Sequence, residues 1–192
     1  MRTFLAITTA LLFACPLHAQ PLKKPAEFAH IESDAARAAA IFNEAAKVFQ
    51  HARCANCHPA TERPLQTDRS KPHIPVVSRG PEGFGNAGLR CQSCHQALNS
   101  ATGVPGAPHW HLAPVSMSLV AKSAAEICMQ VKDRSQNGDR SIGVIIQHVA
   151  WDPLIQWAWA PGGGREAPPG THQTFVALMS AWAAAGAACP TE

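Results

Sequence analysis

The 192-residue chain carries a formal net charge of +3, from 16 basic and 13 acidic side chains, and only 15% of its residues are charged. Without a cluster of Lys or Arg, so small an excess argues against a nucleic-acid surface. The 13 glycines and 16 prolines indicate a loop-rich globular domain, and no apolar run beyond the N-terminus is long enough to span a membrane.

The N-terminus has the pattern of an export signal. Arg2 precedes an apolar stretch over residues 4–14, and the segment ends at Ala19, a residue suited to signal cleavage. We therefore expect a signal peptide over residues 1–19 and a mature chain exported to the periplasm. A lipoprotein signal acylated at Cys15 is the weaker alternative, because an aromatic side chain stands beside that cleavage site.

Apolar residues between Ala38 and Phe49 recur at helical spacing after a loose lead expected over residues 20–32. Asp34 near the start and Arg53 near the end suit the helix dipole. This predicted helix leads directly into the first of two cysteine motifs.

Four cysteines form two copies of one pattern: Cys54-x-x-Cys57-His58, the first motif, and Cys91-x-x-Cys94-His95, the second motif. This is the attachment signature of c-type haem. Two thiols add to the two vinyl groups of one porphyrin, and the following histidine offers its imidazole to the iron. The sequence therefore predicts two covalent haem c groups, with His58 and His95 as axial ligands.

Two other interpretations of paired cysteines are weaker. A zinc site would hold one tetrahedral metal with four thiolates, but the 33 residues between the pairs exceed the usual spacing, and zinc explains neither histidine. A thioredoxin-like dithiol would need a strand and helix context that the sequence does not provide.

Three further helices are expected after the second motif. Ser123 and Glu126 form a capping box for a helix ending near Asn137, Ser141 opens the next helix, and Thr171 opens the last. The stretches 59–90 and 99–114 are rich in Pro and Gly and predict loops wrapped over porphyrin, with no strand alternation. The expected fold is therefore an all-α single domain over residues 33–192, with about four helices and long haem-wrapping loops.

Two cysteines remain outside the motifs. Cys128 lies on the apolar face of the helix opened by Ser123, and Cys189 follows the last helix. In an oxidising compartment these two are expected to form a disulfide, which by the chain-entropy argument stabilises the fold by on the order of 4 kcal/mol. Two buried free thiols are the alternative.

Each haem iron of an electron carrier commonly takes His or Met as a second axial ligand. His73 lies between the motifs in a turn flanked by prolines, which makes it a candidate, and either His109 or His111 is expected to bind the other iron. Met117 could replace them. His148 lies on a helix flank, where it could contact a propionate, solvent or iron.

The other histidines are expected at the surface: His30, His51 and His172. Scattered basic side chains of the loops could pair with propionates or an acidic partner: Arg63, Arg69, Lys71, Arg79 and Arg90.

Several blocks between about Ala52 and Pro190 carry a family resemblance: residues 54–60, 63–66, 105–114, 126–133, 157–159 and 164–166. They resemble a family of exported bacterial dihaem cytochromes labelled isoquinoline 1-oxidoreductase subunit. The resemblance implies a redox partner, a molybdenum hydroxylase acting on aldehydes or N-heterocycles. Nothing in the chain resembles a molybdopterin or iron–sulfur site, so the resemblance implies an electron-transfer subunit and not the catalytic one.

The expected function is therefore periplasmic electron transfer, without catalysis of its own. A dihaem peroxidase-like enzyme is one alternative, but it requires an open distal site, and such proteins are typically longer, with two haem domains. A small dihaem subunit of a periplasmic reductase, such as that for nitrate, fits the length but not the C-terminal blocks.

Overall fold

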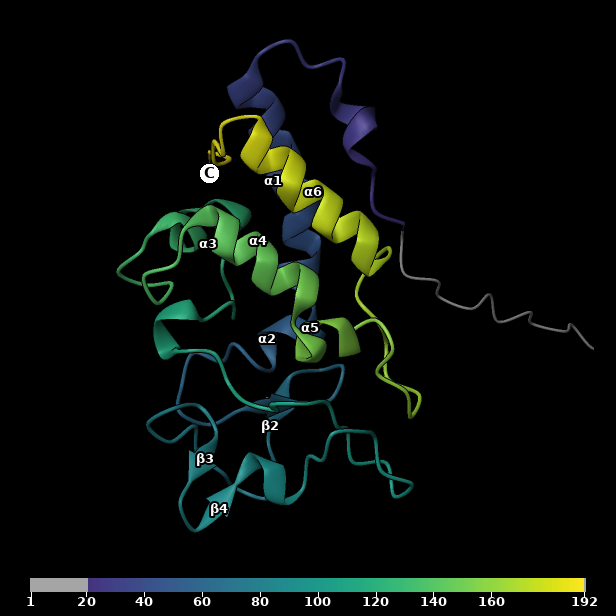
Figure 1. The fold of residues 1–192 in the computed structure, drawn as a ribbon, viewed down its shortest axis with the longest axis vertical. Coiled ribbons are helices and arrows are strands. Elements are labelled where there is room, and N and C mark those ends of the chain that lie inside the picture. The colour runs from purple at the N-terminus through teal and green to yellow at the C-terminus, as the bar shows by residue number, and fades with distance from the viewer. Residues whose placement is uncertain (1–20, 192) are drawn as a thin grey trace, which may run out of the picture.

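The computed structural model describes residues 21–191, and the fold is mainly α-helical, as expected. The predicted signal peptide over residues 1–19 and Cys15 lie outside the described residues. Figure 1 shows two unlike parts: a helical half (residues 21–58 and 118–191) above, and a loop half (residues 59–117) below. Among the described residues, no helix is long and apolar enough to cross a membrane.

The helical half contains six α-helices: α1 (Asp34–Phe49), α2 (Ala52–Ala55), α3 (Ala124–Lys132), α4 (Ile142–Trp151), α5 (Pro153–Trp157) and α6 (His172–Ala184). α1 packs along α6, while α3 and α4 cover the sides of this pair. The buried core lies between these helices, where the rings of Phe42 and Trp182 contact each other with centroids 4.9 Å apart. The short helices α2 and α5 lie at the end of the bundle that meets the loop half (Figure 1).

The first predicted helix is interrupted just before the first motif. Ser33 caps α1 by accepting a hydrogen bond from the Ala36 amide, and α1 ends at Phe49. His51 then acts as the N-cap of the separate helix α2, because its Nδ1 accepts a hydrogen bond from the Arg53 amide. The expectation that His51 is a surface residue is corrected: it is half-buried and has a structural contact.

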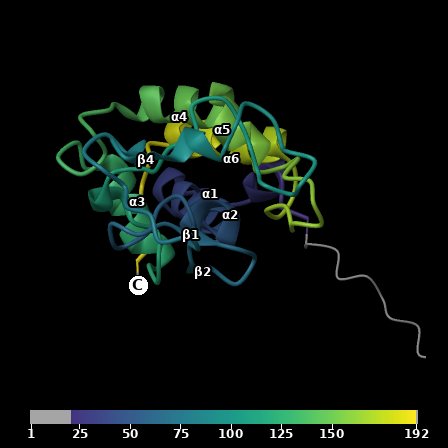
Figure 2. The same ribbon diagram turned by 90° about the horizontal axis from the view of Figure 1, so that it is seen from below.

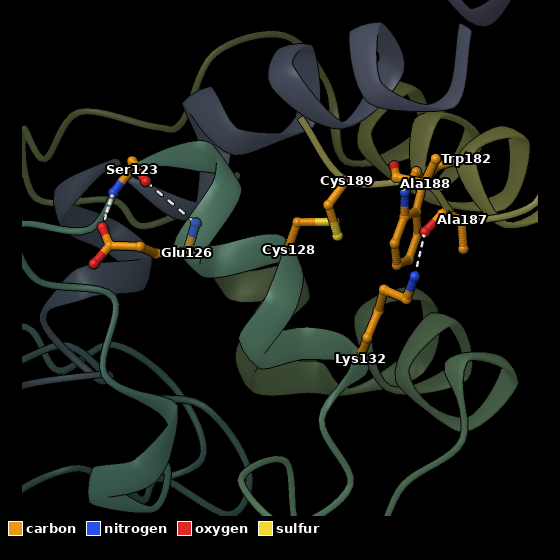
Figure 3. The surroundings of a disulfide bond; sticks show 8 residues. All are labelled: Ser123, Glu126, Cys128, Lys132, Trp182, Ala187, Ala188 and Cys189. Atoms are coloured by element: carbon orange, nitrogen blue, oxygen red, sulfur yellow. Dashed lines mark hydrogen bonds between the residues drawn. A yellow bond between two sulfur atoms is a disulfide. The ribbon is translucent and has the colours of Figure 1, made fainter. Parts of the chain in front are cut away.

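α3 ends at Lys132, five residues before the predicted end near Asn137. The Asn137 side chain is buried and donates to the carbonyls of Val131 and Arg140, at 2.8 and 3.0 Å. The first bond satisfies a carbonyl group in the last turn of α3, and the second holds the turn toward α4. The predicted capping box at Ser123 and Glu126 is confirmed (Figure 3).

The C-terminal segment is tied to α3. The predicted disulfide between Cys128 and Cys189 is confirmed, and Figure 3 shows it beside two hydrogen bonds that hold the same segment. Lys132 Nζ donates to the Ala187 carbonyl at 2.8 Å, and Trp182 Nε1 donates to the Ala188 carbonyl at 3.0 Å. The chain after α6 is therefore fixed on the helical half.

The N-terminal segment expected to be a loose lead packs on the same half. A 3₁₀ helix covers Pro25–Phe28, and the side chains of Leu22 and Phe28 join the hydrophobic core. The Lys23 amide also donates to Glu44 of α1 at 3.1 Å.

The loop half contains two small antiparallel hairpins, so the expectation of no strands is corrected. β1 (Leu65–Gln66) pairs with β2 (Lys71–Pro72), and β3 (Gly85–Asn86) pairs with β4 (Leu89–Arg90). Strands of two residues are too short to show alternation in a sequence. Gly85 has φ of 86°, and a Cβ there would lie 2.6 Å from the Leu89 carbonyl oxygen, so the second hairpin requires glycine. Two further 3₁₀ helices complete this half: Cys91–Ser93 and Val115–Met117.

Candidate functional site

The first motif lies on a single helical turn. The His58 amide donates to the Cys54 carbonyl at 3.1 Å, which continues the helical geometry of α2 through the motif. Positions i, i+3 and i+4 share one helix face, so the spacing brings both thiols and the imidazole to the same side. All three side chains, Cys54, Cys57 and His58, line one cavity of about 430 Å³.

Both halves of the molecule form the walls of this cavity. Helical residues of α1, α3, α4, α5 and α6 contribute apolar side chains, among them Phe49, Val131, Ile145, Leu154 and Phe175. The opposite wall comes from loop residues 81–84 and 111–114. Figure 2 shows α4 and α5 on one side of α2 and the β1–β2 hairpin on the other. A largely apolar cavity of this volume is typical of a site for a cofactor.

The imidazole of His58 is held in the neutral form. Its Nδ1 donates to the Met117 carbonyl at 2.7 Å, so Nε2 keeps its lone pair. Burial lowers the pKa of His58 to about 4. The hydrogen bond to Met117 raises this pKa, while the nearby groups His148, Arg79 and His111 lower it further. A neutral imidazole with one engaged nitrogen is the form that binds a metal ion.

The thiols of the first motif are neutral as well. Burial and the neighbouring Cys57 raise the pKa of Cys54 to about 12, and burial raises the pKa of Cys57 to about 11. Thiols with raised pKa values of this kind are poor thiolate nucleophiles, which suits attachment or structural roles better than redox catalysis. In the described residues, no group of three or more His, Cys, Asp or Glu side chains could hold a metal ion. A haem iron requires only two side chains, because the porphyrin supplies the others.

Three residues that line the cavity have buried donors without a partner among the described residues. They are Arg53 Nε, Arg79 Nε and Nη1, and Trp159 Nε1. Arg79 Nη2 donates to the Thr61 carbonyl at 2.9 Å, but Glu62 stays 3.7 Å from Nε, too far for a hydrogen bond. Because buried polar groups are nearly always paired, these donors fit an occupant of the cavity that carries anionic oxygen atoms.

The second motif has the same local geometry in a more open place. The His95 amide donates to the Cys91 carbonyl at 2.9 Å, while Cys91 is half-buried and Cys94 is exposed. His95 Nδ1 donates to the Pro105 carbonyl at 2.7 Å, so Nε2 is again the nitrogen left for a ligand. Burial lowers the pKa of His95, against the raising effect of that hydrogen bond, and keeps the ring neutral.

The structure brings His73 to His95. Their ring centroids lie 6.0 Å apart, and His73 Nδ1 donates to the Pro75 carbonyl at 2.9 Å. The two imidazoles are therefore near enough to bind one metal ion together, with Nε2 of His95 left for that role by the bond from its Nδ1.

Trp110 is a residue of this second site that the motif itself does not indicate. Its ring stacks on His95, with centroids 4.3 Å apart and planes 1° from parallel, and Trp157 contacts it edge-on. Its place between His109 and His111 is the sequence signal that could have pointed to it, since a buried aromatic fixes the orientation of such a loop.

The side chains of His109 and His111 lie in different places, as expected for two loop residues separated by a single residue. His111 lines the cavity of the first motif, with its ring 5.1 Å from that of Phe84, whereas His109 is exposed and does not line the cavity.

Met117 lines the cavity too. Its carbonyl accepts the hydrogen bond from His58, which places Met117 on the same side as that imidazole. His148 of α4 also lines the cavity. His172, which was expected at the surface, donates through Nε2 to the Val149 carbonyl at 2.7 Å.

The two motifs are adjacent in space. Gly83 lines the cavity of the first motif, and its carbonyl accepts hydrogen bonds from the Leu112 amide at 2.9 Å and from Cys91 Sγ at 3.8 Å. One loop residue therefore contacts the wall of the first site and a thiol of the second.

No family model matches the chain, and no match was found among the curated proteins or among the solved structures. The function of these sites therefore rests on their own geometry and chemistry.

Proposed function

We propose that this protein is a periplasmic electron carrier with two covalently attached c-type haems. When bound, each haem supplies a one-electron iron couple. The observation that carries the proposal is the proximity of the two motifs at Gly83, which borders the cavity of the first motif and has its carbonyl oxygen 3.8 Å from Cys91 Sγ of the second. Two redox groups held this close together suit the transfer of electrons through the molecule.

The first motif offers the residues that such a group requires. Cys54 and Cys57 would form the thioether bonds, and His58 would supply an axial nitrogen. The unpaired donors of Arg79 and Trp159 fit the carboxylates of the haem propionates. The apolar walls keep water away from the remaining surface of the ring.

The second motif would hold the second group through Cys91, Cys94 and His95, with His73 as the opposite axial ligand. The 6.0 Å separation of the two imidazoles supports this pairing, which retains the sequence-based choice of His73. Two His ligands favour a lower potential than a His/Met pair. The exposure of Cys94 makes the loop half the part that would face a redox partner.

The partner that the family resemblance implies is a molybdenum hydroxylase, and we propose it as donor or acceptor. This chain would then act as its electron-transfer subunit and carry out no catalysis. A redox protein that docks through the loop half needs only close approach to the second motif, since the first motif is enclosed.

Haem content and spin state test the proposal. The secreted protein should have a mass that includes two haems, a pyridine spectrum of thioether type, and two irons reduced by dithionite. Both irons should be low-spin and should not exchange ligands with cyanide or peroxide. A colourless protein would overturn the cytochrome function, and a high-spin haem that reacts rapidly with peroxide would favour the peroxidase-like alternative.

His73→Ala tests the second axial pair. One haem should become high-spin while both stay covalently attached, because attachment depends only on the four motif cysteines. His109→Ala is the matched control, since His109 is an exposed histidine of the same half and should leave both irons low-spin. An unchanged low-spin spectrum in His73→Ala would contradict the pairing of His73 with His95.

A further inference from the structure

The cavity of the first motif contains a second imidazole with the hydrogen-bonding pattern of a metal ligand. His148 projects from α4, whereas His58 follows α2, and both side chains line the same cavity. Figure 2 shows these two helices at separate positions in the fold, so the two histidines come from different elements around the cavity. The site thus has an imidazole on a wall other than the one that carries the attachment cysteines.

A carboxylate holds the ring of His148. Its Nδ1 lies 3.2 Å from Asp152 Oδ2, one helical turn further along the chain. Asp152 is itself fixed, because its Oδ1 accepts a hydrogen bond from the Leu154 amide at 2.8 Å as the N-cap of α5. An imidazole whose Nδ1 is engaged by a carboxylate presents Nε2 as its metal-binding nitrogen, and the carboxylate makes the ring a stronger donor.

The other candidates in the cavity are less suitable. Met117 lies on the side of His58, as its carbonyl accepts from that ring. His111 contacts Phe84, whose carbonyl accepts from the Cys91 amide at 3.0 Å, so His111 belongs to the wall shared with the second motif. The Nδ1 of His111 is engaged by a neutral carbonyl, that of His109, whereas His148 has the carboxylate that makes an imidazole the stronger donor.

We infer that His148 is the second axial ligand of the haem attached at the first motif, and that Asp152 is the residue that positions it. This inference rests on the proposed function, because it assumes a haem attached through Cys54 and Cys57. It makes the first site a bis-histidine site whose second ligand comes from α4, and it gives the Asp152 carboxylate control over the potential of that iron.

Replacement of the ligand separates this inference from the proposed function. His148→Ala should keep two haems by mass but turn one high-spin, and free imidazole should restore the low-spin spectrum. His111→Ala, from the same cavity, should leave both irons low-spin. Low-spin irons in His148→Ala at full haem content would overturn the ligand assignment, whereas an absence of haem in the unaltered protein would overturn the proposed function instead.

A second variant covers the case in which His148→Ala does not fold. His148→Met retains a ligand atom and should remain low-spin, with the midpoint potential of one haem raised because thioether ligation favours ferrous iron. A potential unchanged from that of the unaltered protein would contradict iron ligation at this position.

Asp152→Asn tests the positioning role. Asn retains an acceptor for the N-cap of α5, but it removes the negative charge beside the His148 ring. Both irons should stay low-spin, and the midpoint potential of the first haem should rise while that of the second stays constant. If neither potential changes, Asp152 has only a structural role.

Discussion

The two motifs have the same local geometry but lie in very different surroundings. The first is enclosed by five helices and by loop residues 81–84 and 111–114, with its thiols and imidazole directed into one cavity. The second follows the β3–β4 hairpin, whose strands have two residues each, and its Cys94 is exposed. One haem would therefore serve as part of the protein core, whereas the other would form part of the surface available to a partner.

The distribution of apolar side chains explains this difference. Apart from prolines, the buried hydrophobic side chains in residues 59–117 are few: Ala107, Trp110, Leu112 and Met117. The same segment exposes several large apolar side chains, including Ile74, Val76 and Leu98. A segment with so little core of its own depends on contacts with the helical half and with the apolar group it would carry. The comparison predicts that the two sites contribute unequally to stability.

The largest effect is expected from removal of the attachment thiols. In Cys54→Ala/Cys57→Ala, a cavity of about 430 Å³ would stay unfilled. An apolar cavity without its occupant destabilises the surrounding fold, and we expect a loss on the order of 5 kcal/mol, a large part of the stability of such a domain. We expect little folded protein, measured as secreted yield and helical circular dichroism. The matched variant Cys91→Ala/Cys94→Ala should fold with one haem. Equal losses in the two variants would remove the proposed distinction between core and surface haem.

Loss of the disulfide should have the next largest effect on stability, and this effect should be confined to the helical half. Cys128 and Cys189 are 61 residues apart, and the chain-entropy argument gives about 4 kcal/mol for a loop of that length. Cys128→Ala/Cys189→Ala should therefore unfold at a temperature lower by about 10 °C, measured by circular dichroism. Its haem spectra should match those of the unaltered protein. A changed spin state would mean that the bridge supports the redox sites directly.

A smaller effect is expected from the charge of Arg79, whose buried side chain lines the first cavity. A positive charge favours the reduced iron, so Arg79→Gln should lower the midpoint potential of the first haem. An interaction of about 1 kcal/mol corresponds to about 40 mV for a one-electron couple. Redox titration should show a much smaller shift for Arg90→Gln, because Arg90 is exposed beside the second motif and screened by water. Equal shifts would contradict the difference in enclosure.

The smallest effect concerns the pH dependence of the cap before the first motif. Burial, followed by the charge of Arg53, lowers the pKa of His51 from 6.5, so the folded state binds this proton less readily than the unfolded chain. Its contribution is present above the unfolded value and is lost as the pH falls through the folded one. His51→Asn retains an N-cap acceptor that does not titrate, and the contribution at stake is below about 1 kcal/mol.

Denaturant unfolding at several pH values should therefore show a smaller loss of stability on acidification in His51→Asn than in the unaltered protein. A parallel pH dependence in both proteins would mean that the contact with the Arg53 amide contributes nothing measurable.

Local patterns in the sequence were sufficient for several elements. The capping residues Ser123, Ser141 and Thr171 each begin a helix as predicted, because a cap depends on neighbours within one turn. The disulfide was predictable because two cysteines remained beside helices of one compact domain. The C-x-x-C-H spacing predicts three side chains on one helical face, and the structure brings those of the first motif to one cavity.

What surrounds the motifs depended on tertiary structure. Nothing near Arg79 in the sequence indicates that its donors are buried beside a cavity that also has walls from α3, α4, α5 and α6. His148 seemed a flank residue, although Asp152 four positions later was a local signal for a held imidazole. Spacing along the chain was sufficient to propose thioether attachment at Cys54, Cys57, Cys91 and Cys94, since that chemistry depends on the local pattern alone. Only the folded chain decided which histidines share a cavity and which motif is enclosed, because those relations join residues far apart in sequence.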